Sequence, residues 1–318
     1  MHKRPLFADL PRPTGETLPL AWGLEEDGVG MLASIRPQTA VAAAALVKTG
    51  RRINLDLPLH VPLAMLPAHA HRIREAPRHE LDVSTYQGLP IRDDRVTFHP
   101  QASSQWDSLA HVGDPTHGFY DGASSDDIHL QAGSRNGVDR YAEFGIFTRG
   151  IYVDLPEFFA RANRSWSAAG SQACHADDLR RALAQGGLTP QPGDVLCVRT
   201  GWLEAFRSAD AAGKAELFLK RDYSGLAGDA AMWELLWDAG FGAVVSDSVT
   251  VEVWPLALGK PSLHLAIARL GLVLGEMFDL DALRAAVREE GRNAFLFVSK
   301  PLNLRGGIGS PPNAMAVF

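Results

Sequence analysis

Cysteine is scarce in this 318-residue sequence: Cys174 and Cys197 are the only two, and neither belongs to a Cys-x-x-Cys pair. This excludes a zinc ribbon and a thioredoxin-like redox motif, and two cysteines are too few for a disulfide framework in a chain of this length. Cys197 lies within an apolar run. Because unpaired cysteines are usually buried, we expect it to be a structural thiol.

Long hydrophobic stretches are also missing. No window reaches the roughly 18 apolar residues that a membrane-spanning helix requires, and the basic residues 1–5 are not followed by the apolar segment of a secretory signal. With a net charge of −6, the chain lacks the excess of basic residues that is typical of nucleic-acid-binding proteins. We therefore expect a cytoplasmic protein that acts on a small molecule and binds neither a membrane nor a nucleic acid.

Several common active-site motifs are absent. The sequence has no GxxxxGK(S/T) phosphate loop and no Gly-x-Gly-x-x-Gly after a strand. Residues 306–309 are glycine-rich, but no helix-forming segment follows them, so we interpret them as a loop. The Gly-x-Ser-x-Gly nucleophile elbow is missing too, which argues against a serine α/β-hydrolase.

The sequence has the composition of a folded globular protein, with 46% hydrophobic and 21% charged residues. Such a composition supports a sizeable core and argues against disorder. Residues 1–34 are rich in proline and glycine, which predicts an extended entry segment. We expect residues 35–318 to form one catalytic domain, because neither a repeat nor a long linker interrupts them.

Helix and strand patterns alternate from residue 35 onward. We expect helices at 38–48, 176–185, 230–239 and 262–270, and strands at 53–57, 150–155, 195–199, 243–245 and 272–274. Residues 60–95 have no clear period and are interpreted as loop with short strands. The alternation indicates an α/β sheet protein.

Two pairs of side chains carry the candidate chemistry. Asp107 and His111 are four residues apart, so on a helix or a tight loop they can converge on a metal or serve as ligand and base. His264 precedes an apolar helix, and Glu276 follows the next apolar run. Burying that pair is costly unless a partner or a metal compensates it. Taken separately, Asp107 and His111 also fit an ordinary surface pair. His264 and Glu276 also fit a capped helix start and a carboxylate at the end of a strand.

Taken together, these residues resemble the cyclase family, which includes bacterial kynurenine formamidase and isatin hydrolase. Asp107-xxx-His111 is similar to the second half of the family signature HxGTHxDxxxH, and His264 and Glu276 have its twelve-residue His-to-Glu spacing. Further similar segments follow in the family's order: 47–51 (VKTGR), 149–154 (RGIYVD), 192–196 (PGDVL) and 199–202 (RTGW). The resemblance implies an α/β fold with a mixed, partly barrel-like β-sheet and flanking helices.

One departure from the family signature affects the metal. Gln101 and Gln105 stand where the signature has its two leading histidines, so the chain resembles a QWD branch and not the kynurenine formamidase branch. Neutral amide oxygens argue against two zinc ions and against kynurenine formamidase activity itself. The resemblance implies one divalent ion, manganese or zinc, and oxygen ligands shift that preference towards manganese or magnesium.

The resemblance also implies the roles in the site. Asp107, His264, Gln105 and Glu276 are the expected metal ligands, and His111 and Glu276 the expected catalytic groups, with His111 as base or as a further ligand. We expect metal-activated water to cleave an amide, a cyclic amide or a lactone-type ester. The pocket is expected to be lined by Trp106, His117, Phe119 and Tyr120, although these also fit a loop with core aromatics. His69, His71 and His99 are weaker ligand candidates.

Two other functions remain open. The same metal could serve a lyase, an isomerase or a true cyclase by stabilising an enolate, and Gln101 and Gln105 are also consistent with a binding protein whose site has decayed.

The resemblance implies a homo-oligomer, a dimer or tetramer. The apolar tail 314–318 could dock on a neighbouring subunit or fold back on its own core.

Overall fold

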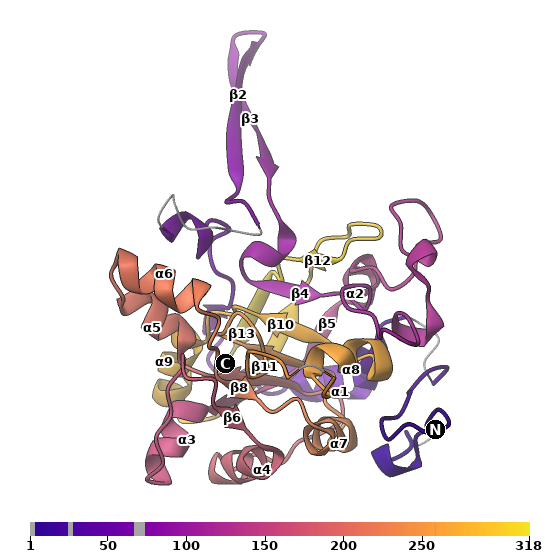
Figure 1. The fold of residues 1–318 in the computed structure, drawn as a ribbon. Helices are drawn as coiled ribbons and strands as arrows, with labels where there is room; N and C mark the ends of the chain where they lie inside the picture. The colour runs from indigo at the N-terminus through magenta and orange to yellow at the C-terminus, as the bar shows by residue number, and fades with distance from the viewer. Residues whose placement is uncertain (1–3, 25–27, 67–73, 258) are drawn as a thin grey trace.

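The computed structural model describes residues 4–24, 28–66, 74–257 and 259–318. Its centre is a nine-stranded mixed sheet in the order β1-β13-β11-β5-β7-β9-β10-β4-β12 (Figure 1). The bounds along this order are Arg52–Asn54, Ala314–Val317, Ala294–Ser299, Ile146–Asp154, Val195–Arg199, Ala243–Ser246, Leu274–Glu276, Gln105–Asp107 and Gly309–Ser310. The expected α/β class with a mixed, curled sheet and flanking helices is confirmed.

The middle of the sheet is parallel, and both flanks are antiparallel. β5, β7, β9 and β10 pair in parallel, whereas β4 and β12 on one side and β11, β13 and β1 on the other pair antiparallel. All five residues of β7 are buried. A parallel strand covered on both faces needs such a continuous apolar run, which explains why Cys197 is buried as expected.

Helices flank the sheet, with α3, α4 and α7 on its lower side in Figure 1. The bounds of α1 to α9 are Pro37–Ala44, Asp139–Phe144, Leu155–Arg161, Ala176–Gln185, Trp202–Ser208, Ala211–Leu219, Ala230–Asp238, Leu263–Leu270 and Leu280–Glu290. A short parallel pair joins β6 (Ala173–Cys174) to β8 (Gly225–Leu226). In the described parts of the chain, no helix is both long and apolar enough to cross a membrane.

Both ends of the chain pack on this body. The Trp237 indole donates a hydrogen bond to the Pro5 carbonyl at 2.9 Å, and Phe7 and Leu10 are buried in the main core. At the other end, β13 pairs with β1 and β11, and Phe318 is fully buried. The C-terminal tail therefore folds back on its own core.

The segment expected to be mostly loop contains a long hairpin instead. β2 (Arg78–Tyr86) and β3 (Leu89–Thr97) pair over nine residues each and project from the body (Figure 1). Gln87 and Gly88 join them with φ angles of 48° and 81°. A two-residue turn with positive φ at both positions matches the twist of a hairpin. The hairpin is exposed on both faces, and its apolar residues alternate with polar ones only over short stretches, at Leu81 and Val83 and at Leu89 and Ile91. Such a short pattern is a weak signal for a strand of nine residues.

Two of the segments that resemble the family, 149–154 and 192–196, contact each other through their side chains. The Arg149 guanidinium on β5 donates two hydrogen bonds to the Asp194 carboxylate, at 2.8 and 2.6 Å. Asp194 follows the turn at Gly193, where φ is 89° and a Cβ atom would lie 2.9 Å from the Ser34 carbonyl oxygen. A two-pronged arginine–carboxylate pair is among the strongest polar contacts in proteins. These residues therefore hold the start of β7 beside β5 and have a structural role.

Asp56 gives a stability prediction. Its carboxylate accepts a hydrogen bond from the Ala314 N–H at 2.9 Å, and burial raises its pKa from 3.8 to about 6. The folded protein thus binds the proton more tightly than the unfolded chain, so stability falls as pH rises from about 4 to above 6. Asp56→Asn keeps the acceptor and removes the charge.

We expect Asp56→Asn to raise the free energy of unfolding by about 1–3 kcal/mol at pH 8, since one pKa unit corresponds to about 1.4 kcal/mol. At pH 4 the difference from the wild type should shrink towards zero. Urea denaturation at both pH values measures this. An equal effect at both would show that the charge of Asp56 is not what costs stability.

Candidate metal-binding active site

The candidate site lies where the end of β10 meets the start of β4. The two strands pair antiparallel with Glu276 opposite Gln105 and Gly275 opposite Trp106. Alternate residues of a strand point to opposite faces, so Gln105 and Asp107 share one face and Trp106 points to the other. The carboxyl ends of parallel strands are the usual place for ligands in open α/β sheets, and Glu276 ends such a strand.

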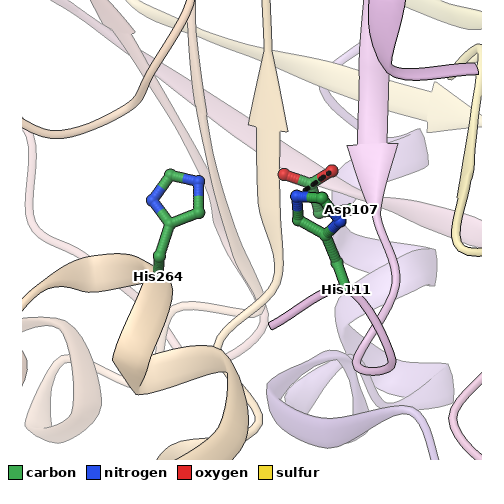
Figure 2. A group of neighbouring side chains, drawn as sticks. All are labelled: Asp107, His111 and His264. Carbon is green, nitrogen blue, oxygen red and sulfur yellow. Dashed lines mark ion pairs between the residues drawn. The ribbon is translucent and has the colours of Figure 1, made fainter. Parts of the chain in front are cut away.

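His111 reaches the site from the turn after β4. Its Nε2 atom lies 3.8 Å from the Asp107 Oδ1 atom, and Figure 2 shows the imidazole beside that carboxylate. The turn is held by two backbone hydrogen bonds, from Ser108 to the Ile308 carbonyl and from His111 to the Ser108 carbonyl. The four-residue step predicted from the sequence therefore brings the two side chains together through a tight turn.

His264 approaches from the other side, on the first turn of α8 (Figure 2). Its Nδ1 atom lies 2.6 Å from Glu252 Oε1, and its Nε2 atom lies 3.4 Å from Glu276 Oε1. Glu252 is fully buried and also accepts hydrogen bonds from the backbone N–H groups of Leu263 and His264. One carboxylate thus anchors the start of the helix and orients the ring, leaving Nε2 directed into the site.

These groups form an arrangement that suits a cation. One ligand atom each from Asp107, His111 and His264 lies within 4.8 Å of the other two. Within the described residues, three buried oxygen atoms nearby lack a hydrogen-bond partner: Asp107 Oδ2, Glu276 Oε1 and Gln105 Oε1. Buried polar atoms are normally paired. A divalent ion held by carboxylate, imidazole and amide oxygen would satisfy them, so the residues present fit a metal.

Gln105 links the two carboxylates. Its Nε2 atom donates to Glu276 Oε2 at 2.7 Å and lies 3.4 Å from Asp107 Oδ1. The side chain is 1% exposed, so its amide oxygen is held inside the cluster. Gln105 therefore positions Glu276 and also offers a neutral oxygen to a cation.

The electrostatics agree with this arrangement. Burial, together with the negative charge of Asp107, raises the pKa of Glu276 to about 7. Burial alone would lower the pKa of His264, but the carboxylates of Glu252 and Glu276 outweigh it and raise that pKa. Two buried carboxylates repel each other, and a positive ion between them would relieve the repulsion.

A cavity of about 230 Å³ opens onto this cluster. His111, His264 and Glu276 form one part of its lining. The remaining lining residues are mainly apolar and aromatic, with two arginines: Leu63, Arg74, Gln101, Ala102, Phe218, Leu219, Arg221, Tyr223, Val249, Thr250, Trp254 and Met277. Apart from Gln101, the sequence analysis did not identify these residues, because they come from separate segments of the chain and carry no motif.

The aromatic residues expected to line the pocket lie elsewhere. Trp106 is fully buried on the opposite face of β4, where it packs edge-on against Phe278 and its indole donates to Ser299 at 2.9 Å. Strand alternation places it there: it cannot share the face of Gln105 and Asp107. In the core of the described structure it therefore has a packing role.

The downstream segment is also separate from the cavity. His117 contacts Glu16 at 2.7 Å, and Tyr120 is buried beside Gly271. His117, Phe119 and Tyr120 are not among the residues that line the cavity in the described part of the chain. His99 is exposed, whereas His69 and His71 lie outside the described residues.

Glu252 is the functional candidate that the sequence did not reveal. It precedes His264 by twelve residues and lies in an apolar segment, Val251-Glu252-Val253, where a buried charge is costly without partners. The cost of burying this charge in an apolar segment was the feature of the sequence that could have identified Glu252. Carboxylates that hold the outer nitrogen of a metal-binding histidine fix its orientation, and their loss usually weakens metal binding by roughly 10–100-fold.

We therefore expect Glu252→Gln to weaken the affinity for manganese or zinc by roughly 10–100-fold, since the amide cannot replace the charge behind His264. Isothermal titration calorimetry measures this, with circular dichroism confirming the fold. Glu234→Gln, on the exposed side of α7, is the matched control. Unchanged affinity in Glu252→Gln would exclude a role for Glu252 in the metal site.

The fold and the cluster together define an α/β protein with a candidate divalent-metal centre at the carboxyl edge of its sheet. The chain belongs to the cyclase family, whose model matches residues 34–253. This confirms the resemblance on which the interpretation of the sequence was based.

Solved structures with this fold include a novel cyclase, with a TM-score of 0.81 and 27% identity over 94% of this chain and 99% of that chain. Isatin hydrolase A from Labrenzia aggregata, bound to benzyl benzoate, gives a TM-score of 0.58 at 16% identity over 86% and 94%. An isatin hydrolase bound to the product analogue thioisatinate gives 0.56 at 17% identity over 89% and 99%. Among curated proteins, no match is found.

Proposed function

We propose that this protein is a metal-dependent hydrolase that uses water to cleave an amide, a cyclic amide or a lactone-type ester. The observation that carries the proposal is the convergence of Asp107, His111 and His264 at one end of an apolar cavity. Family membership supports an enzyme, and isatin hydrolases, which share the fold, are named for a cyclic amide substrate.

Asp107 and His264 are the proposed ligands of one manganese or zinc ion, with Gln105, Glu276 and His111 available to complete the site. When bound, such an ion polarises a carbonyl group and makes a nearby water more acidic. The protein residues fix where this happens, because Asp107 and Glu276 are buried and Glu252 holds His264 in one orientation.

His111 and Glu276 are the proposed proton carriers. Both face the cavity, where His111 Nε2 can accept a proton from the attacking water. Glu276 lies beside His264 and can hand a proton to the leaving nitrogen or oxygen. The apolar walls around Phe218 and Trp254 exclude bulk water and hold the organic part of the substrate.

The size of the cavity favours a small substrate. At about 230 Å³ it lies below the roughly 300–1,000 Å³ that is typical of sites for drug-sized ligands. The direct experiment is a hydrolysis screen of N-formyl aromatics, cyclic imides, isatin and lactones, with manganese or zinc added. The proposal predicts turnover in at least one of these classes. No turnover in any class, by protein shown to contain its metal, would contradict it.

A homo-oligomer remains part of the proposal. The C-terminal tail pairs within the sheet of its own chain, so the proposal places the contact elsewhere. Exposed Leu81, Val83 and Tyr86 on the projecting hairpin offer apolar surface for one. We expect light scattering at micromolar concentration to report a dimer or tetramer. A monomer across that range would contradict the expectation.

A further inference from the structure

We propose that Arg74 and Arg221 form an anion-binding subsite in the active-site cavity, which selects substrates whose aromatic ring carries a carboxylate in addition to the bond to be cleaved. This inference rests on the proposed hydrolase function and adds the chemical class of the substrate. It follows from the charges that line the cavity and from the partners that those charges have.

Both arginines line the same cavity as His111, His264 and Glu276. Within the described residues, Arg221 makes no ion pair and no side-chain hydrogen bond, and Arg74 donates one hydrogen bond, to the Gln101 carbonyl at 2.9 Å. Neither guanidinium is paired with a carboxylate of the described chain. Their remaining N–H groups are therefore available to an anion in the cavity.

Several other arginines of this protein are neutralised by carboxylates. Arg199 is buried among Asp154, Glu204 and Asp281, and Arg207 donates to Asp279 at 2.7 Å. Arginines in or near the interior are thus usually matched by carboxylates of the chain itself, as the cost of burying charge requires. Arg221 is exposed and Arg74 is half-buried, and both line the cavity without an ion-paired carboxylate, at a place where a ligand would supply the negative charge.

The cavity has an excess of positive charge once Glu276 is accounted for. Glu276 is the one carboxylate among the described lining residues. Gln105 donates to its Oε2 atom, His264 Nε2 lies 3.4 Å from its Oε1 atom, and the charge of Arg74 also acts on it. A planar guanidinium matches the geometry of a carboxylate with two parallel hydrogen bonds. The excess positive charge of the cavity therefore favours a ligand with a carboxylate over a ligand with a neutral group.

The segment that carries Arg221 also contributes aromatic side chains to the cavity. Arg221 has φ of 59°, in the left-handed region that a non-glycine residue seldom adopts. This turn follows the end of α6, and the cavity is lined by Phe218 and Leu219 from the last turn of that helix and by Arg221 and Tyr223 after it. The arginine is thus presented together with two aromatic rings, and Trp254 adds a third. An aromatic carboxylate matches such walls in both shape and charge.

The experiment uses two probes that differ by one charge: 3-carbamoylbenzoate, with an amide and a carboxylate on one ring, and the neutral isophthalamide. Their affinities for the purified protein are measured by calorimetry, which does not depend on turnover. We expect the wild type to bind the anionic probe at least 10-fold more tightly. Arg74→Gln and Arg221→Gln should each reduce that preference several-fold, and the double variant should remove it.

Arg92→Gln, on the exposed hairpin and outside the cavity, is the matched control and should keep the preference. Arg221→Lys, which retains the charge, should keep part of it. Equal binding of the two probes by the wild type, or no measurable binding of the anionic one, would overturn the subsite. A preference that the double variant retains would also overturn it, because the carboxylate would then bind at the Asp107–His264 cluster.

The outcomes for the subsite and for the hydrolase function are separable. Loss of the preference in folded arginine variants supports the subsite even if no substrate in the screen is hydrolysed, and in that case the hydrolase proposal alone fails. Hydrolysis of neutral amides together with equal binding of the two probes would instead leave the hydrolase and remove the subsite.

Discussion

Replacing Asp107 with alanine should remove the bound metal and abolish hydrolysis. Asp107 is the one carboxylate among the three groups that converge in the described structure, and it is 1% exposed. Without it, the site loses the carboxylate beside His111, and Glu276 beside His264 is the one carboxylate of the proposed ligand set that remains. The loss of activity should therefore exceed the roughly 10–100-fold that removal of an outer partner of a metal ligand costs.

Elemental analysis and the hydrolysis assay should be applied to Asp107→Ala and His264→Ala together. The wild type should contain close to one divalent ion per chain, and each variant should lose most of it. Asp126→Ala, which removes an exposed acid far along the chain from the cluster, is the control for a general effect of lost charge. Full metal occupancy in both site variants would place the metal elsewhere.

Replacing His111 with asparagine should lower kcat by roughly 10²-fold or more, the usual scale for a positioned acid–base group. The imidazole lies 3.8 Å from Asp107 and faces the cavity, so it can act on the water that attacks the substrate. If His111 is mainly a base, the variant should keep its metal while kcat falls.

The same variant also tests the ligand role, which the convergence with Asp107 and His264 supports equally well on geometry. If His111 is mainly a ligand, metal and activity should disappear together. Metal content and kcat measured on one preparation therefore separate the two roles. Near-normal turnover by His111→Asn would contradict both roles and the mechanism with them.

The sequence was sufficient to predict much of the fold, because the central strands are buried on both faces and alternate with helices. The strand expected at 195–199 and the helix expected at 176–185 have the bounds found in the structure. The hairpin of β2 and β3 could not be recognised in the same way. Its strands are exposed on both faces, and the turn residues Gln87 and Gly88 lack the Asn-Gly or Asp-Gly pair that commonly marks such turns.

For the site, spacing along the chain was informative only where the fold is local or follows the family order. The four-residue step from Asp107 to His111 corresponds to a tight turn in the structure. The spacing from His264 to Glu276 corresponds to a helix followed by a strand. The cavity walls were not predictable, because residues 63, 218 and 254 meet through long-range packing. Trp106 was assigned to the pocket from its neighbours in sequence, but strand alternation directs it into the core.

The most direct test of the account is hydrolysis in water labelled with oxygen-18, by protein first stripped with a chelator and then reloaded with manganese or zinc. For the substrate that the screen identifies, product should form only after a metal is restored, and mass spectrometry should find one labelled oxygen in each newly formed carboxylate. Turnover that persists in the stripped protein would contradict the metal requirement. Product without labelled oxygen would contradict hydrolysis and indicate a lyase, an isomerase or a true cyclase.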